Sequence, residues 1–291
     1  MSRFSREQIE AIYATHPLRK HTLLRRLLQQ RGSLVGLTAL DFAEDQLTQI
    51  SDQNHTGGLT FTRQLAERAG ISRASVVLDL GCGLGGSARA LAWLYGCRVH
   101  GLVLSAQRIS EAIELTTLVG LEHLVTFACG DAMATPLPQR RFDVLWGQAA
   151  WSHVEDKRGL LRKWTAGLAP AGCVAVEDVC LLRPARGDTE RRLLASLEDH
   201  WTSYLVALDG RDGWRRIVED SGCAIRVDED CSQEFRKHLL ELRTGADRLE
   251  EPVIAFERHA WTLAAEAIEA GLIGYFRIVA SVSVRGRARS A

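Results

Sequence analysis

Short apolar runs alternate with amphipathic stretches along the middle of the chain, from Ser75 onward. In the apolar runs hydrophobic residues follow one another directly, at 75–80, 98–104, 124–129, 142–147 and 173–179. The stretches between them repeat apolar residues at helical spacing, at 86–96, 105–120 and 157–168. Strands without alternation, separated by helices, are typical of a parallel sheet covered on both faces. The pattern therefore predicts an α/β fold with a doubly wound sheet and a ligand site at the carboxyl ends of its strands.

The alternation is interrupted after Val179. The stretch "DTERRLLASLEDHWTSYLVALDG" places its large apolar residues on one helical stripe, namely Leu193, Leu194, Leu197, Trp201, Tyr204, Leu205 and Leu208. A helix and then a strand are predicted within 213–230, a long helical stretch at about 233–270, and a closing strand from Gly274, which makes seven strands. Residues 1–70 are predicted to be helical, with Gly32 ending one helix.

These patterns divide the chain into four parts. We expect an N-terminal helical cap at 1–58, a sheet core at 59–182, a lid insertion at 183–212, and the remainder of the core at 213–291, with a helical insertion at about 233–270. The insertion after the fifth strand is the natural lid, because it must close over the carboxyl edge of the sheet.

Composition and charge exclude several classes of protein. Apolar residues make up 46% and charged residues 25% of the 291 residues, which is typical of globular chains. Lys plus Arg and Asp plus Glu both number 36, so there is no global basic field to attract nucleic acid. No stretch resembles a signal peptide or a membrane span of roughly 20 apolar residues. The seven cysteines are odd in number and lack a C-x-x-C pair, which favours free thiols in a reducing cytoplasm over disulfides or a zinc site.

A glycine-rich loop follows the first predicted strand in "VVLDLGCGLGG". Gly81, Gly83 and Gly86 fit G-x-G-x-x-G, a pattern that by itself suits either a dinucleotide or S-adenosylmethionine (SAM). A dinucleotide site typically has an acidic residue at the end of the second strand, where this chain has Val103. Asp79 precedes the glycines, and a buried carboxylate there would repel a pyrophosphate but attract the ammonium of an amino acid. The loop therefore favours a cofactor with an amino-acid end.

Further motifs follow in order. "VVLDLGCGLGG" resembles the first motif of class I SAM-dependent methyltransferases, "FACGDAMATPLP" their third-strand motif, and "LAPAG" the "LKPGG" before their fifth strand. The resemblance covers about residues 50–182, and 213–230 and "GYFRIVA" match the last strands. It implies a Rossmann-like, mostly parallel, seven-stranded sheet and transfer of a methyl group from SAM.

Within this family the chain most resembles the small-molecule branch of sarcosine/dimethylglycine and tocopherol-type methyltransferases. "GLVLSAQ" follows the branch's "GxTLSxxQ", and "NHTGG" resembles its "H-x-G-G" segment. The form makes Gln107 the expected partner of the cofactor ribose, although Gln107 could instead simply begin a helix.

The resemblance assigns further roles. Asp79 is expected to hold the SAM ammonium, the glycines to admit the cofactor to the backbone, and the helix after Gly85 to direct its amides at the SAM carboxylate. Asp131 and the Ala132 amide are expected to bind adenine, with a plain turn as the alternative for Asp131, and Gln148 to bind the methionine part or face the methyl group. The full predicted cofactor set is Asp79, Gly81, Cys82, Gly83, Leu104, Gln107, Asp131, Ala132 and Gln148.

Catalysis is expected at His153, in "QAAWSHVEDK" after the fourth strand. A histidine can take the proton that an amine, hydroxyl or thiol acceptor must lose. The alternative, that His153 only orients its loop by hydrogen bonding, is equally open. Trp151, Trp201 and Tyr204 are candidates for the wall of the acceptor pocket, with hydrophobic core as the alternative.

The first hypothesis is therefore methylation of a small metabolite, with an amine nitrogen as first candidate acceptor. C- or O-methylation of a specialised metabolite and a non-catalytic SAM-binding module remain alternatives. A metal-assisted reaction is disfavoured, because Glu177 and Asp178 form an acidic pair without a clear partner set. Arsenite methylation and nicotinamide-dependent oxidoreduction rank lower still. Homo-oligomerisation stays open.

Overall fold

The computed structural model describes residues 6–16, 18–44, 51–55, 57–137, 142–201, 203, 210–246 and 252–282. Tyr204, Leu205 and Leu208 of the predicted stripe lie outside these residues.

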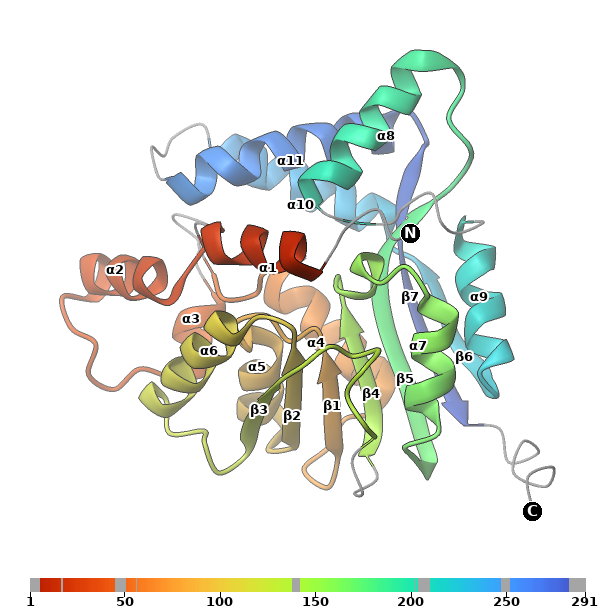
Figure 1. Cartoon of the computed structure of the whole chain (residues 1–291). Helices are drawn as coiled ribbons and strands as arrows, with labels where there is room; N and C mark the ends of the chain where they lie inside the picture. The colour runs from red at the N-terminus through yellow and green to blue at the C-terminus, as the bar shows by residue number, and fades with distance from the viewer. Residues whose placement is uncertain are drawn as a thin grey trace.

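Seven strands form one sheet at the centre of the molecule (Figure 1). They are β1 (Val76–Leu80), β2 (Arg98–Val103), β3 (Val125–Cys129), β4 (Phe142–Gln148), β5 (Leu168–Leu181), β6 (Cys223–Asp230) and β7 (Ile273–Val282). Their order is β3-β2-β1-β4-β5-β7-β6, and β7 runs antiparallel to both of its neighbours while the other pairs are parallel. The predicted doubly wound, mostly parallel, seven-stranded sheet is confirmed.

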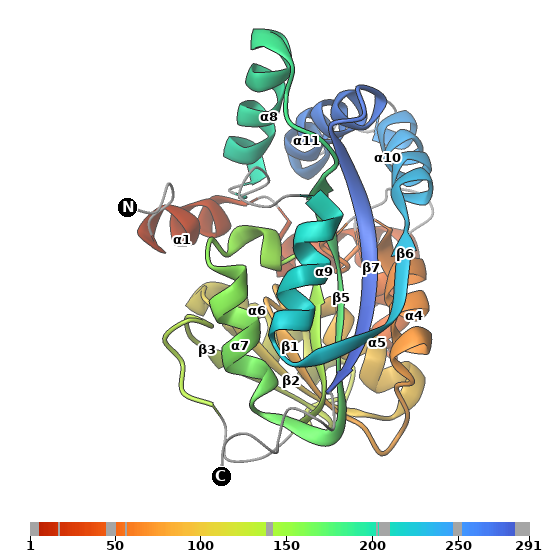
Figure 2. The same cartoon turned by 90° about the vertical axis from the view of Figure 1, so that its right-hand side faces the viewer.

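Helices cover both faces of the sheet, as Figure 2 shows from the side. One face packs on α4 (Gly58–Ala69), α5 (Gly86–Tyr95) and α6 (Ala106–Leu118), and the other on α7 (Lys157–Thr165) and α9 (Gly210–Asp220). Consecutive residues of β1 serve the two faces, since Val77 belongs to the first core and Leu78 to the second. Burial on both sides explains why the strands carry apolar residues at successive positions.

The N-terminal helices lie beside the carboxyl edge of the sheet. They are α1 (Arg6–Thr15), α2 (Lys20–Arg31) and α3 (Ala39–Ala43). Gly32 ends α2 in the left-handed conformation, with φ of 70°, so its predicted role is confirmed. A capping box of Thr38 and Asp41 begins α3.

A second helical layer lies across the top of the molecule in Figure 1. It contains α8 (Gly187–Trp201), α10 (Ser232–Ala246) and α11 (Pro252–Glu269). The stretch predicted to be helical at about 233–270 contains α10 and α11. The predicted four-part division of the chain stays a prediction.

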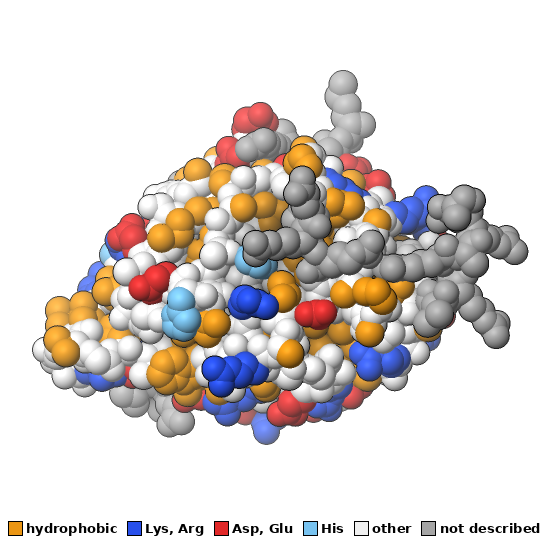
Figure 3. Space-filling view, turned by 90° about the horizontal axis from the view of Figure 1, so that it is seen from below, with side chains coloured by type: hydrophobic (Ala, Val, Ile, Leu, Met, Phe, Trp, Pro, Cys, Tyr) orange, Lys and Arg blue, Asp and Glu red, His pale blue; other side chains and the backbone are white. Residues whose placement is uncertain are grey.

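The surface beneath the sheet carries both signs of charge. Figure 3 shows Lys and Arg side chains interspersed with Asp and Glu over this face. No helix within the described ranges is long and apolar enough to cross a membrane.

Candidate functional site

A cavity of about 960 Å³ lies at the carboxyl ends of β1, β2, β4 and β5. It is lined by the loops that follow these strands, by α1, and by residues 51–55, 57 and 58. Helices α8, α10 and α11 line its upper part. Eleven of the thirteen predicted site residues lie in its wall, namely Asp79, Gly81, Cys82, Gly83, Leu104, Asp131, Ala132, Gln148, Trp151, His153 and Trp201. Gln107 is not among the lining residues, and Tyr204 lies outside the described ones.

Asp79 is a buried carboxylate at the end of β1. Its side chain has no hydrogen bond at Oδ2, and only 3% of the residue is exposed. Burial raises the pKa of Asp79 to about 7. A buried polar atom without a partner costs free energy, so the site is suited to a cationic ligand that would pair with this oxygen.

The glycine loop keeps the floor of the cavity free of side chains. Gly81 has φ of 93°, and a Cβ there would lie 2.5 Å from the Cβ of Ala150. The amides of Gly81 and Cys82 donate to the carbonyl of Leu102 at 2.8 and 3.3 Å, which ties the loop to β2. Gly83 has φ of 54° and open space where its Cβ would be. Glycine at both positions therefore serves the turn, and at Gly81 it also permits the close approach of Ala150.

The first turn of α5 borders the same floor. Gly86 and Ser87 line the cavity, and Gly85 precedes the helix in the left-handed conformation. The first amides of a helix have no partner within the helix and carry partial positive charge. This end of α5 therefore suits a carboxylate.

The end of β2 provides Leu104 to the cavity but directs Gln107 elsewhere. Gln107 is exposed on α6, and with its amide oriented for hydrogen bonding its oxygen accepts from the Arg19 guanidinium. Its contact with ribose stays a prediction.

The turn after β3 is held rigidly. The Asp131 carboxylate accepts from the Met133 amide at 2.7 Å, which is the turn interaction weighed from the sequence. The carbonyl of Ala132 accepts from Lys163 Nζ and Trp164 Nε1, both at 3.0 Å. Adenine binding by Asp131 and Ala132 stays a prediction that this fixed turn accommodates.

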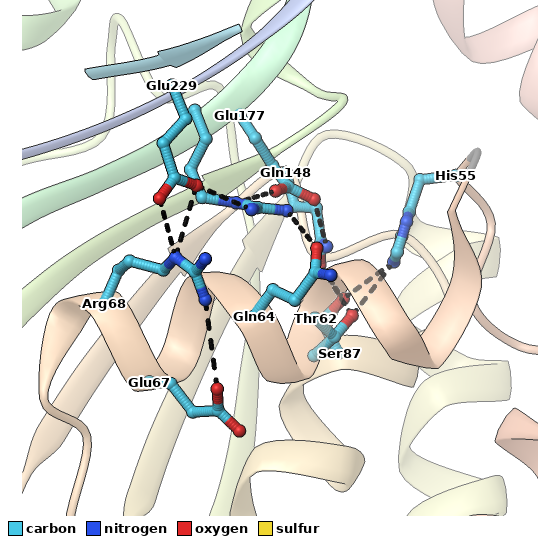
Figure 4. A network of polar contacts seen from close by, with 10 residues as sticks. His55, Thr62, Gln64, Glu67, Arg68, Ser87, Gln148, Glu177 and Glu229 are labelled. Atoms are coloured by element: carbon cyan, nitrogen blue, oxygen red, sulfur yellow. Dashed lines mark hydrogen bonds and ion pairs between the residues drawn. The ribbon is translucent and has the colours of Figure 1, made fainter. Parts of the chain in front are cut away.

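Gln148 lies at the centre of a buried polar network (Figure 4). Its Oε1 accepts from Thr62 Oγ1 at 3.0 Å and from Ser87 Oγ at 2.7 Å, and its Nε2 donates to Glu177 Oε1 at 2.8 Å. Both ends of its amide are thus engaged, so Gln148 fixes the cavity wall from behind. Its predicted contact with methionine or methyl would have to compete with these bonds.

The network continues away from the cavity through charged groups. Glu177 Oε2 accepts from Arg277 Nε at 2.8 Å, and Arg277 also binds Glu229 at 2.9 Å. Glu177 and Arg277 are both almost fully buried. Burial raises the pKa of Glu177 to about 7, with the Arg277 guanidinium opposing the shift.

His153 ends a single turn of 3-10 helix, Trp151–His153, that follows β4. Asp178 holds this turn, since its Oδ2 accepts from the Ser152 amide and its Oδ1 from the Val179 amide, both at 2.8 Å. Burial raises the pKa of Asp178. The hydrogen bonds from the two backbone amides oppose this rise, and so, to a smaller extent, do the nearby charges of His153 and Lys157.

Tyr13 contacts His153 in the wall of the cavity. The phenol oxygen lies 3.4 Å from His153 Nε2, and the two rings meet edge to face. Tyr13 comes from α1, 140 residues earlier in the chain. The site thus places a phenol in contact with an imidazole that can accept a proton, and the buried Asp178 lies close enough to interact with the charge of His153.

Backbone strain also occurs beside His153. Ala149 has φ of 47°, and no other non-glycine residue among those described has a positive φ. Such a conformation costs free energy and persists only where the surrounding structure supports it. Strained residues of this kind are concentrated at functional sites.

Trp151 is mainly a structural wall. It is 1% exposed, donates from Nε1 to the Leu80 carbonyl at 3.1 Å, and stacks on Trp214. Trp201, at the end of α8, is partly buried and lines the upper cavity.

Sequence reasoning missed Tyr13 and the part played by Asp178. The signal for Asp178 was its place at the carboxyl end of the fifth strand, where it was weighed only as a metal ligand. In the described part of the chain, no group of three or more His, Cys, Asp or Glu is placed to hold a metal ion.

Residues 78–176 match the family described as a methyltransferase domain. The predicted resemblance to class I SAM-dependent methyltransferases is thereby confirmed, and the matched segment extends from β1 into β5.

Two curated relatives are similar to more than half of the chain. Methyltransferase GfsG of Streptomyces halstedii is 31% identical over 180 residues, which are 62% of this chain and 63% of that protein. Phosphoethanolamine N-methyltransferase 1 of Arabidopsis thaliana is 28% identical over 196 residues, which are 67% of this chain and 38% of that protein. The chain spans less than two thirds of the length of either relative.

A solved structure has the same fold. It is phosphoethanolamine N-methyltransferase 2 of Haemonchus contortus, in complex with phosphomonomethylethanolamine and S-adenosylhomocysteine. The TM-score is 0.72 at 20% identity, over 88% of this chain and 59% of that one.

Proposed function

We propose that the protein is a SAM-dependent methyltransferase that methylates a small molecule, with an amine nitrogen as the first candidate acceptor. The observation that carries the proposal is the unpartnered, buried carboxylate oxygen of Asp79 beside a glycine loop that lines the cavity. Relatives named as methyltransferases, among them an amine N-methyltransferase, support it.

The residues present fit SAM. Asp79 would pair with the ammonium, the first turn of α5 would meet the carboxylate, and Gly81 and Gly83 would admit the chain between them. The adenosine end would lie toward Leu104 and Asp131. When bound, SAM supplies an electrophilic methyl group on a positively charged sulfur.

Methyl transfer to nitrogen then needs alignment, removal of a proton and exclusion of water. SAM held in this way would supply the methyl carbon to the acceptor nitrogen, and the electron pair of its carbon–sulfur bond would remain on sulfur. The proton leaves the nitrogen for His153, which Tyr13 contacts at 3.4 Å and whose positive charge the carboxylate of Asp178 stabilises.

Two alternatives remain. C- or O-methylation of a specialised metabolite would use the same cofactor site, because only the acceptor atom changes. A non-catalytic SAM-binding module would bind the cofactor without transferring its methyl group. The pairing of Tyr13 and His153 over the cavity favours catalysis over this alternative.

Location and partners belong to the same proposal. We infer a cytoplasmic enzyme acting on a free small molecule, without nucleic acid or membrane as partner and with homo-oligomerisation left open. The seven free cysteines fit a reducing compartment, and the interspersed charges of Figure 3 offer no basic surface on that face.

The test is transfer of a labelled methyl group from SAM to acceptors in a metabolite extract, with Asp79→Asn as control. We expect labelled product from the wild type and much less from the variant. Binding of SAM by titration calorimetry, but no label in any acceptor, would favour the non-catalytic module instead.

A further inference from the structure

Aromatic and aliphatic side chains line the part of the cavity above His153. Trp201 comes from α8, Phe235 and Leu242 from α10, Trp261 from α11 and Tyr275 from β7. Phe235 and Tyr275 stack with centroids 4.6 Å apart and an interplanar angle of 11°. Such a wall favours burial of apolar surface and offers ring faces for stacking.

One polar atom interrupts this wall. The hydroxyl of Tyr275 is buried and has no hydrogen-bond partner within the described residues. Burial raises the pKa of Tyr275 well above 10, so the hydroxyl stays protonated. It therefore offers a single hydrogen bond to a ligand within otherwise apolar surroundings.

The charged residues of the cavity disfavour a phosphate. Of the described lining residues, eight are acidic: Glu44, Asp52, Asp79, Asp131, Glu155, Asp156, Asp178 and Glu241. Arg63 is the one Lys or Arg among them; it lies 3.4 Å from Glu44 and is 43% exposed. His238, beside Glu241 on α10, has its pKa lowered by burial, which keeps it neutral. Phosphate recognition in proteins relies on clustered Arg or Lys, which this wall lacks.

We propose, on the basis of the methyltransferase function above, that the acceptor has an apolar, unphosphorylated body. This body sits between Trp201, Trp261 and the stacked pair of Phe235 and Tyr275, and the reacting group points down to His153. The Tyr275 hydroxyl bonds to one polar group on that body. The phosphobases named for the phosphoethanolamine relatives are thus poor acceptors for this chain.

Three primary amines with one shared end test the proposal. 2-Phenylethylamine, ethanolamine and phosphoethanolamine share an aminoethyl group and differ in carrying a phenyl ring, a hydroxyl or a phosphate. Their dissociation constants are measured by calorimetry on the full chain saturated with S-adenosylhomocysteine. We expect 2-phenylethylamine to bind at least about tenfold more tightly than the other two, because it buries a ring.

Two variants locate the effect in the wall. Trp201→Ala should remove most of the preference for 2-phenylethylamine and leave ethanolamine and S-adenosylhomocysteine binding unchanged. Trp261→Leu, which keeps an apolar side chain of substantial volume, should reduce the same preference with circular dichroism unchanged. A preference unaltered in both variants would place the ring elsewhere and overturn the assignment.

The ranking itself can also refute the proposal. Tighter binding of phosphoethanolamine than of 2-phenylethylamine overturns it, and so does equal or undetectable binding of all three amines. Failure of the methyltransferase function would appear separately, as absence of S-adenosylhomocysteine binding before any amine is added.

Discussion

Protonation of Asp79 should control how tightly the cofactor binds. Burial raises the pKa of this carboxyl from 3.8 to about 7 in the unliganded protein. An ammonium pairs with the ionised form only, so binding must be accompanied by loss of a proton wherever Asp79 is still protonated. The perturbations are therefore a change of pH across this range and the substitution Asp79→Asn.

The expected size follows from the pKa. With a pKa of about 7, the carboxyl is about 9% ionised at about pH 6 and about 76% ionised at about pH 7.5, so the affinity should rise about eightfold. Asp79→Asn removes the charge-assisted bond, which is worth about 1.5–3 kcal/mol, or roughly 10- to 150-fold in affinity. The variant should also lose the pH dependence.

The stability of the unliganded protein should move in the opposite direction. Between the unfolded pKa of 3.8 and the folded pKa of about 7, the folded state holds a proton that the unfolded state has released. The free energy of unfolding therefore falls as pH rises through this window, by up to about 4 kcal/mol for about 3 pKa units. Asp79→Asn should raise the melting temperature more at about pH 8 than at about pH 5.

Titration calorimetry with S-adenosylhomocysteine, which carries the same ammonium, measures the affinities, and thermal unfolding measures the stability. A wild-type affinity that does not change with pH and equals that of Asp79→Asn would refute the reasoning. A variant less stable than wild type at high pH would show that the buried carboxylate has a partner.

Three further outcomes are expected. Gln107→Ala should weaken S-adenosylhomocysteine binding about 2- to 12-fold, the range for one neutral hydrogen bond, without changing acceptor affinity. An unchanged dissociation constant for S-adenosylhomocysteine would show that Gln107 contacts Arg19 and not the ribose. His153→Ala should lower turnover about 10²- to 10⁴-fold and remove the rise of the rate with pH, while calorimetry finds cofactor binding retained. Tyr13→Phe should lower turnover less. Full activity of both variants would show that Tyr13 and His153 have only a structural role. Asp52→Asn should cost about 3–5 kcal/mol in denaturant unfolding, because Arg89 is left buried with its charge uncompensated; a loss below about 1 kcal/mol would contradict this.

The sheet and its glycine loop could be predicted because they depend on local pattern. Unalternating apolar runs such as the one ending at Leu80 occur where both faces of a strand are buried, and the glycines mark the turn that follows. The position of Asp79 at the end of this strand could be predicted for the same reason, since it is fixed by its neighbours in sequence.

The partners of the site residues could not be predicted, because they come from distant parts of the chain. Nothing near His153 in sequence indicates that Tyr13 of α1 contacts it. Gln148 has the position of a ligand-binding residue, but Thr62 and Glu177 occupy its amide. Trp151 lines the cavity, but its indole nitrogen donates to the Leu80 carbonyl, and its predicted contact with the acceptor stays a prediction.

The close fit between residues 51–55 and α5 has a consequence for folding. Arg89 of α5 is fully buried against Asp52 at 2.7 Å, and a Cβ on Gly86 would lie 2.1 Å from the Asp52 carbonyl oxygen. Without Asp52, the guanidinium of Arg89 would be buried in the core with its charge uncompensated by this carboxylate. The segment that carries Asp52 and helix α5, whose first turn lines the cavity, should thus melt in a single cooperative transition, and a fragment beginning after Asp52 should not acquire a native α5.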